Sequence, residues 1–279
     1  MTAEILDGKK LAHKIREDLK AKVSNLEIKP GLAVVLVGND PASQIYVSGK
    51  EKACNESGML SKKIILDDAV SEMELMKLVD ELNQDKEIHG FIVQLPLPKQ
   101  INSHLVIDGI LPSKDADGFS PINMGNLLIG KNKITPATPK GIMRLLDEYK
   151  IDLEGKHAVI VGRSNIVGKP ISVLLQQRHC TVTMCHSRTQ NLGEITKQAD
   201  ILISAVGKAK LITKEMVKEG AVVVDVGMNR EDGKLHGDVD FENVKEVASY
   251  ISPVPGGVGP LTIAMLLENT LECYDYTIS

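Results

Sequence analysis

The sequence has no tryptophan and only three phenylalanines among its 279 residues. Proteins that bind single-stranded nucleic acid stack bases on aromatic side chains, so this composition argues against such a platform. Basic residues are not in excess either, because 33 Lys and Arg stand against 37 Asp and Glu, for a formal net charge of -4. Nucleic-acid surfaces are normally basic. We therefore expect no nucleic-acid partner and favour a small-molecule ligand.

The four cysteines form no CxxC pair, and a chain of this length needs no disulfides to hold its fold. We expect four reduced thiols. Cys180 and Cys185 lie beside His179 and His186 in the sequence. They flank a strand-like run and match no common zinc spacing, so we expect no metal site.

Long apolar runs are also missing. None approaches the roughly 18 residues that a membrane-crossing helix needs. The first twenty residues mix charged with apolar residues where a signal peptide would have an apolar core. These two absences predict a cytoplasmic protein without a membrane partner.

The chain length is comfortable for two domains, each large enough to bury a core. Apolar periodicity in the first half alternates between helix and strand, which is typical of a parallel α/β sheet. A capping box of Ser71 and Glu74 marks one helix start. Helices are expected at about residues 7–24, 41–57 and 71–83, and strands at 31–38, 62–66 and up to 95.

Residues 95–139 are rich in proline and glycine, have little periodicity, and are expected to line a ligand cleft. A helix over residues 139–150 then leads to four strand-like runs, at residues 156–162, 181–185, 201–207 and 221–227, and a last helix at about 261–273. We predict a two-lobed α/β protein with a cleft between the lobes. Residues 1–138 would form an N-terminal α/β catalytic domain, with helix 262–279 packing back on it, and residues 139–261 a Rossmann-like domain.

The run HAVIVGRSNIVGKP suggests a dinucleotide site. Gly162 ends a strand and Gly168 precedes Pro170, which suits a first helical turn. Such glycines let a helix N-terminus approach a pyrophosphate. The spacing is G-x5-G and not the usual GxGxxG, and a tight turn alone is the alternative. The βα units that follow favour dinucleotide binding.

The second strand of this region predicts which dinucleotide binds. An NAD site usually has a carboxylate there for the ribose hydroxyls, whereas this chain has His186, Ser187 and Arg188. Together with Arg163, these residues offer donors to a 2′-phosphate. Ordinary solvated arginines are the alternative, but their joint placement favours NADP.

Tyr46 and Lys50 lie four residues apart on an expected helix, so they share one face, and Ser43 lies one turn earlier. A lysine acts as a general acid or base only if burial or a neighbour lowers its pKa. On spacing alone, a solvated lysine and a packing tyrosine are the more usual interpretation.

Six motifs in order change that balance. They are YVSGK at Tyr46–Lys50, QLPLP at Gln94–Pro98, KDADG at Lys114–Gly118, TPATPKG at Thr135–Gly141, GRSNIVGKP at Gly162–Pro170 and PVPGGVGP at Pro253–Pro260. Over essentially the whole chain, this set resembles the bifunctional methylenetetrahydrofolate dehydrogenase/methenyltetrahydrofolate cyclohydrolase family.

The resemblance implies an enzyme of tetrahydrofolate interconversion in one-carbon metabolism, which supports purine, histidine and methionine biosynthesis. It would oxidise 5,10-methylenetetrahydrofolate with NADP and hydrolyse the methenyl product to 10-formyltetrahydrofolate. Lys50 would be the general acid/base of hydrolysis, Gln94 would hold and tune it, and Tyr46 would orient the folate. Asp117 would accept hydrogen bonds from the pterin edge, although a turn-capping role in DADG is the alternative.

Further contacts complete the expected site. Folate would contact Ser43, and folate or cofactor would border Pro255, Gly259 and Thr262; a rigid loop is the alternative at PVPGGVGP. The cofactor would contact Thr138, Gly162, Arg163, Ser164, Gly168, His186, Ser187, Arg188 and Met228. The resemblance also implies a homodimer formed largely through the cofactor domain.

Two departures from the family pattern are Ala137, where cysteine is common, and Ala116, where valine is usual; neither removes a group that the chemistry needs. Hydride transfer requires alignment more than a protein base. A shikimate-dehydrogenase-like enzyme would have a GxGG turn in place of GRSNIVG, and a noncatalytic sensor would lack the set of Tyr46, Lys50 and Gln94. A dehydrogenase without cyclohydrolase activity remains open.

Overall fold

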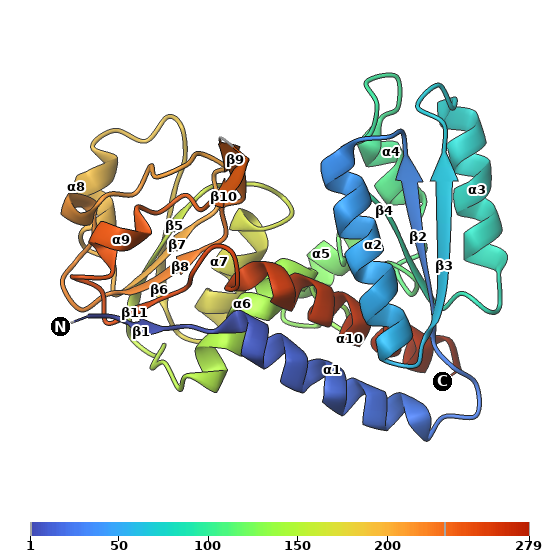
Figure 1. Cartoon of the computed structure of the whole chain (residues 1–279), viewed down its shortest axis with the longest axis horizontal. Coiled ribbons are helices and arrows are strands. Elements are labelled where there is room, and N and C mark those ends of the chain that lie inside the picture. The colour runs from blue at the N-terminus through green and yellow to red at the C-terminus, as the bar shows by residue number, and fades with distance from the viewer. Residues whose placement is uncertain (1, 232, 279) are drawn as a thin grey trace. The chain divides into compact units, whose positions relative to one another are not determined.

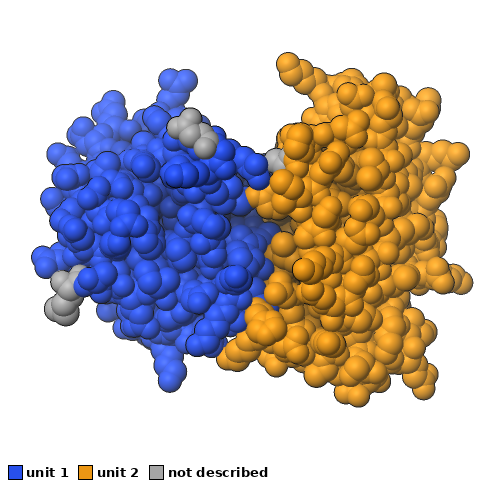
Figure 2. Space-filling model, in the orientation of Figure 1, with its two compact units in different colours: residues 1–12, 138–262 blue, residues 13–137, 263–279 orange. Residues whose placement is uncertain are grey.

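The computed structural model describes residues 2–231 and 233–278, which form two compact units (Figures 1 and 2). Unit 1 comprises Met1–Ala12 and Thr138–Thr262, and unit 2 comprises His13–Ala137 and Ile263–Ser279. The expected first domain began at residue 1, whereas the chain up to Ala12 clusters with unit 1. The physical reason is strand β1 (Glu4–Ile5), which pairs with β11 (Tyr250–Ile251) of that unit.

Unit 1 is built on a six-stranded sheet in the order β1-β11-β8-β7-β5-β6, in which every neighbouring pair is parallel. Its inner strands are almost wholly apolar and buried, as expected for a sheet covered on both faces. Alanine, valine, leucine and isoleucine side chains from these strands form its core. The strands are β5 (His157–Val161), β6 (Thr181–Cys185), β7 (Ile201–Ser204) and β8 (Val222–Asp225).

The connections of unit 1 are mostly short helices, and a small antiparallel hairpin follows β8. The helical segments are α6 (Ala137–Glu148), α7 (Gly168–Gln177), α8 (Leu192–Thr196), a 3-10 turn η1 (Lys214–Met216) and α9 (Phe241–Val244); the hairpin strands are β9 (Asn229–Glu231) and β10 (Lys234–His236).

Unit 2 contains a three-stranded parallel sheet in the order β3-β2-β4. Side chains of α3 pack with alternate residues of the central strand and with Phe91 in one apolar core, and α2 packs against β2 and β3. The elements are β2 (Gly31–Val37), α2 (Pro41–Glu56), β3 (Leu60–Leu66), α3 (Glu72–Gln84), β4 (Gly90–Val93), α4 (Ser103–Gly109) and α5 (Pro121–Leu128).

Two long helices bracket the chain, α1 (Gly8–Ser24) and α10 (Val258–Ile278). Most residues of both helices belong to unit 2. Within that unit, Asn269 of α10 donates to the backbone oxygens of Ala116 and Thr135, at 2.9 and 2.8 Å. The C-terminal helix thus fixes the loop region that carries Asp117. Among the described residues, no helix is long and apolar enough to cross a membrane.

Candidate active site

Helix α2 carries Ser43, Tyr46 and Lys50 in unit 2. Its start is fixed because Asp40 Oδ2 accepts a 2.8 Å hydrogen bond from Ser43 N and Pro41 occupies the first turn. Lys50 is buried, with 8% of its surface exposed, and Tyr46 one turn earlier is half-buried. The helix therefore brings a phenol and a buried amine to one face, as the spacing predicted.

Gln94 is the hydrogen-bond partner of Lys50. It follows β4, where its backbone N donates to Val35 O at 2.8 Å. Its Nε2 donates to Leu95 O at 2.7 Å, which leaves Oε1 to accept a 2.9 Å hydrogen bond from Lys50 Nζ. Burial lowers the pKa of Lys50, and the smaller opposing influence is the negative charge of Asp117. The amine is thus held by a neutral acceptor in surroundings that favour loss of its proton.

Asp117 lies in a loop that a second aspartate organises. The buried carboxylate of Asp115 accepts hydrogen bonds from Gly118 N at 3.0 Å, Ser120 N at 2.7 Å and Asn123 Nδ2 at 2.9 Å. The turn-capping role that DADG permits therefore belongs to Asp115, and the Asp117 side chain has no such bond to the loop among those the structure describes.

The carboxyl group of Asp117 is poorly solvated. It borders a small cavity of about 10 Å³ whose other lining includes Ile92 and Phe119. Burial raises the pKa of Asp117 to about 6, although Lys50 opposes this and Asp115 adds to it. Lys50, Gln94 and Asp117 are therefore brought together, as a buried amine, its acceptor and a carboxyl group whose pKa burial raises to about 6. Such a group can move protons and bind a hydrogen-bond donor.

The glycines of the expected dinucleotide turn serve mainly to let backbone segments approach. Gly162 follows β5 with φ 127°, and a Cβ there would overlap the carbonyl oxygen of Ala205. A Cβ on Gly168 would overlap the carbonyl oxygen of Gly162. Ser164 Oγ accepts from the backbone N of Val167 and of Gly168, at 3.1 and 3.3 Å. Ser164 and both glycines thus hold the turn in shape, and residues 163–166 remain exposed.

The next strand ends in a tight turn. His186 N donates to Thr189 Oγ1 at 2.8 Å, and His186 Nδ1 accepts from Arg188 N at 3.2 Å. Ser187 and Arg188 are exposed. Because β5 and β6 are parallel neighbours, this turn and the exposed Arg163 lie at the same edge of the sheet. Two guanidinium groups and no carboxylate in either turn fit a ligand with a phosphate on its ribose.

The remaining expected ligand residues of unit 1 lie near the starts of α6 and α10 and in the turn after β8. Thr138 Oγ1 and Thr262 Oγ1 are hydrogen-bonded at 2.9 Å, near the starts of α6 and α10. Pro255 is exposed, and Gly259 has open space where a Cβ would be. Met228 follows β8 and is 46% exposed.

Sequence patterns gave no sign of a pair of buried aspartates at the carboxyl edge of the unit 1 sheet. Asp225 ends β8, and Asp238 follows β10; they are 3% and 0% exposed. Burial raises the pKa of Asp225 to about 6, and the charge of Asp238 contributes. The nearest signals in the sequence were the segments DVG at 225–227 and GDVD at 237–240, which have no distinctive spacing.

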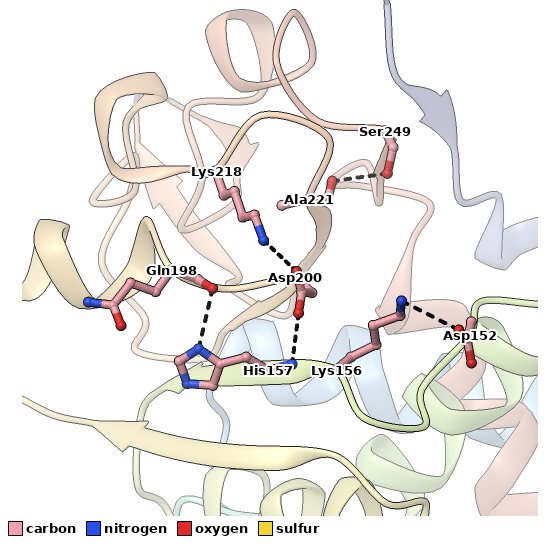
Figure 3. Close-up of polar contacts among 8 residues, drawn as sticks. All are labelled: Asp152, Lys156, His157, Gln198, Asp200, Lys218, Ala221 and Ser249. Atoms are coloured by element: carbon pink, nitrogen blue, oxygen red, sulfur yellow. Dashed lines mark hydrogen bonds and ion pairs between the residues drawn. The ribbon is translucent and has the colours of Figure 1, made fainter.

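The opposite edge of that sheet holds a cavity of about 420 Å³. Two of its three lining lysines pair with carboxylates: Lys218 Nζ lies 2.6 Å from Asp200 Oδ1, and Lys156 Nζ lies 3.4 Å from Asp152 Oδ2 (Figure 3). Asp200 Oδ2 also accepts from His157 N at 2.9 Å. These ion pairs brace the strand starts and leave little net positive charge for an anionic ligand. In residues 2–231 and 233–278, no cluster of three His, Cys, Asp or Glu could hold a metal ion.

Comparison with known proteins identifies the family of both units. Residues 6–117 match the model of the tetrahydrofolate dehydrogenase/cyclohydrolase catalytic domain, and residues 136–278 match that of the NAD(P)-binding domain of the same family. The chain belongs to this family. The "Bifunctional protein FolD" of Halalkalibacterium halodurans is 58% identical over 98% of the chain and 99% of its own length.

Solved structures extend the match to the fold. The bifunctional enzyme FolD from Campylobacter jejuni superposes with a TM-score of 0.97 at 51% identity, covering 99% of both chains. The Trypanosoma brucei enzyme, solved with NADP and an inhibitor, gives 0.96 at 36% identity, over 100% of this chain and 99% of the other. The predicted family and the α/β fold with catalytic and cofactor domains are thereby confirmed.

Shikimate dehydrogenase, the other α/β oxidoreductase considered from the sequence, is similar in fold alone. The enzyme from Aquifex aeolicus has a TM-score of 0.51 at 11% identity, over 90% of this chain and 93% of that one. Family membership therefore excludes the shikimate-dehydrogenase interpretation.

Proposed function

We propose that this enzyme oxidises 5,10-methylenetetrahydrofolate to the 5,10-methenyl form with NADP and then hydrolyses that product to 10-formyltetrahydrofolate. Family membership supports the pair of reactions. The observation that carries the hydrolytic half is the buried Lys50, hydrogen-bonded to Gln94 and close to Asp117. A buried amine whose pKa is lowered is suited to general acid/base catalysis of that hydrolysis.

The residues of unit 2 account for hydrolysis. Neutral Lys50 takes a proton from the water whose oxygen bonds to the methenyl carbon. The carbon–N5 bond then breaks as the new hydroxyl group becomes the formyl C=O and releases its proton to solvent. Lys50 returns the proton it took to N5, which leaves the formyl group on N10. A Lys50 without its proton also avoids repulsion from the cationic methenyl group. Gln94 would keep Nζ in place, Asp117 would hold the pterin edge, and Tyr46 and Ser43 would orient the folate.

The residues of unit 1 fit the cofactor. NADP, when bound, supplies the hydride acceptor. The exposed turn from Arg163 to Ile166 would receive the phosphates, while Ser187 and Arg188 would bind the 2′-phosphate. His186, Met228 and Thr138 would border the remaining parts of the dinucleotide. The NADP held by the Trypanosoma brucei relative supports this choice of cofactor.

Pro255, Gly259 and Thr262 are further proposed contacts, to folate or cofactor. The open space at Gly259 and the exposure of Pro255 are compatible with a ligand there. We also propose that the enzyme is a cytoplasmic homodimer. Light scattering on purified protein would test its oligomeric state.

Two absorbance assays test the function. Purified protein should form NADPH from NADP and methylenetetrahydrofolate, and it should speed the decay of methenyltetrahydrofolate without NADP. Lys50→Met should slow hydrolysis by about 100- to 10,000-fold, the usual contribution of a general acid/base. The control is Lys52→Met on the same helix, whose lysine is exposed and pairs with Glu56 at 3.8 Å. Absence of both activities in the wild type would refute the proposal, and hydrolysis at the wild-type rate in Lys50→Met would refute the lysine's role.

A further inference from the structure

Asp238 is the most heavily hydrogen-bonded side chain at the carboxyl edge of the unit 1 sheet, within the described residues. Its carboxylate accepts from the backbone N of Val206 at 2.7 Å, Gly207 at 3.2 Å and Lys208 at 2.9 Å. Ser204 Oγ and Asn229 Nδ2 add hydrogen bonds of 3.3 and 3.0 Å. These donors compensate for the full burial of the charge.

The first segment held by Asp238 is the loop after β7. Ala205 N donates to Val161 O at 2.8 Å, and the carbonyl of Ala205 lies where a Cβ on Gly162 would be. The loop is thus in backbone contact with the proposed phosphate turn. Its backbone N–H groups at residues 206–208 are used by Asp238, so its outer surface is what a ligand would meet. That surface includes Val206, 36% exposed, and Gly207, which has φ 67° and open space where a Cβ would be.

The second segment is the turn after β8, which carries Met228. Asn229 is bonded to Asp238 directly. Asp225 Oδ1 accepts from Gly227 N and from Asp238 N, each at 2.9 Å. A Cβ on Gly227 would overlap the carboxylate of Asp238. The side chain of Asp238 therefore contacts both turns and fixes their positions relative to each other.

Both segments expose apolar side chains at the carboxyl edge of the unit 1 sheet. Val206 and Met228 are exposed there, and Ile166 of the glycine turn, also at the carboxyl edge, is 40% exposed. Ligands of parallel α/β sheets bind at the carboxyl ends of the strands, and the sites that hold them are lined largely by apolar side chains.

We infer that Asp238 is a positioning residue for the NADP site, which fixes the spacing of the loops that carry Val206 and Met228. This inference rests on the proposed function. Asp238 itself is buried and would not contact the cofactor; it acts by presenting both loops in a geometry preformed for binding. Loss of that geometry should weaken NADP binding and spare hydrolysis, which uses residues of unit 2 and no dinucleotide.

The test compares Asp238→Asn with Asp200→Asn. Asn at 238 places an amide donor against a set of donors, so the dissociation constant for NADPH, measured by fluorescence titration, should rise at least about tenfold. The KM for NADP should rise with it, while hydrolysis measured without NADP stays within about twofold, since its residues lie in unit 2. Asp200 is an aspartate of the same unit at the opposite edge of the sheet, where its carboxylate accepts from His157 N and Lys218 Nζ (Figure 3), so Asp200→Asn should lower the melting temperature without changing NADPH affinity.

A milder pair covers the case in which Asp238→Asn does not fold. Asn229→Ala removes one hydrogen bond to Asp238 and should raise the NADPH dissociation constant about three- to tenfold. Its control, Asn243→Ala, removes a comparable 2.6 Å bond to Asp240 on an exposed part of unit 1 and should have no effect on affinity. Unchanged NADPH affinity in folded Asp238→Asn, or in Asn229→Ala where the former does not fold, overturns the inference. Affinity lost equally in either control also overturns it. Wild-type protein that binds no NADPH instead refutes the proposed function.

Discussion

Lys50 donates its 2.9 Å hydrogen bond to the amide oxygen of Gln94, not to a carboxylate. The choice of partner matters because a carboxylate at that distance would favour the ammonium form, whereas an amide holds the nitrogen without a charge. The carboxyl group that does influence Lys50 is Asp117, and it is less important than burial. Burial thus favours the neutral form of both groups, Lys50 and Asp117.

The identity of the Lys50 partner gives the first prediction. Gln94→Glu should raise the pKa of Lys50, so less of the lysine is neutral at pH 7 and the rate of hydrolysis falls. At pH values below the pKa, the rate should be about tenfold lower than in the wild type for each unit by which the pKa of Lys50 increased. The rate should recover as the pH rises toward the new pKa. The pH profile of methenyltetrahydrofolate hydrolysis, corrected for the uncatalysed reaction, measures this shift.

Gln100→Glu is a matched control, because Gln100 is an exposed glutamine of the same unit that donates to a backbone oxygen. Its pH profile should match the wild type. An unshifted profile in Gln94→Glu would mean that the protonation state of Lys50 does not limit hydrolysis.

Asp117 gives a second prediction. Its pKa is raised to about 6 from the ordinary 3.8, so the carboxylate predominates at pH 7 and takes up a proton as the pH falls through 6. If the carboxylate binds the pterin donors, the KM for folate should rise below pH 6. Well below the pKa, it should rise by about tenfold for each pH unit. Steady-state dehydrogenase assays between pH 5 and 7.5 would measure it.

Asp117→Asn should remove this pH dependence and raise the KM at pH 7 by about ten- to a hundredfold, the usual worth of a hydrogen bond to a charged group. The matched control is Asp108→Asn, an exposed aspartate of α4. A KM that stays flat across the pH range in the wild type would argue against the carboxylate as the pterin ligand.

Much of this arrangement could be anticipated from sequence, because local periodicity determines it. Helix α2 with its shared face of Tyr46 and Lys50 follows from 3.6-residue spacing, and the buried strands follow from valine-rich runs that end in glycine. The capping box of Ser71 and Glu74 could likewise be predicted, and the structure contains it. Gln94 and Asp117 came from the family resemblance, since no spacing rule links them to Lys50.

Other features could not be anticipated, because they depend on tertiary contacts. Residues 95–139 were expected to have little regular structure, yet they contain α4 and α5, whose short sequences are capped by Asn102 and Ser120. Strand β1 is only two residues long and exists because β11 lies beside it. Asp238 binds backbone groups more than 30 residues away in the chain, at Val206 and Gly207, so no local pattern could reveal it.

A third prediction concerns cofactor choice. Arg188→Ala should raise the KM for NADP by about ten- to a hundredfold through loss of charge-assisted hydrogen bonds to the 2′-phosphate, and should hardly affect the KM for NAD. The ratio of kcat/KM for the two cofactors measures the change. Arg178→Ala is the control, because that exposed arginine of unit 1 pairs with Asp147 at 2.9 Å. Equal losses with NADP and NAD in Arg188→Ala would assign Arg188 to a part that both cofactors share.

The glycines give a fourth prediction, because the structure divides them into two kinds. Gly162→Ala forces a Cβ into the carbonyl oxygen of Ala205 at a φ of 127°, so it should destabilise unit 1 by about 2 kcal/mol or more and lower the melting temperature.

Gly259 lies within α10 with open space where a Cβ would be. Gly259→Ala should therefore leave the melting temperature unchanged or raise it slightly. If folate or cofactor approaches that open space, the same substitution should raise a KM by about tenfold, and the substrate whose KM rises identifies which ligand lies there. A Gly259→Ala variant with both KM values unchanged would remove Gly259 from the ligand contacts, while a stable Gly162→Ala variant would show that the glycine turn can shift away from Ala205.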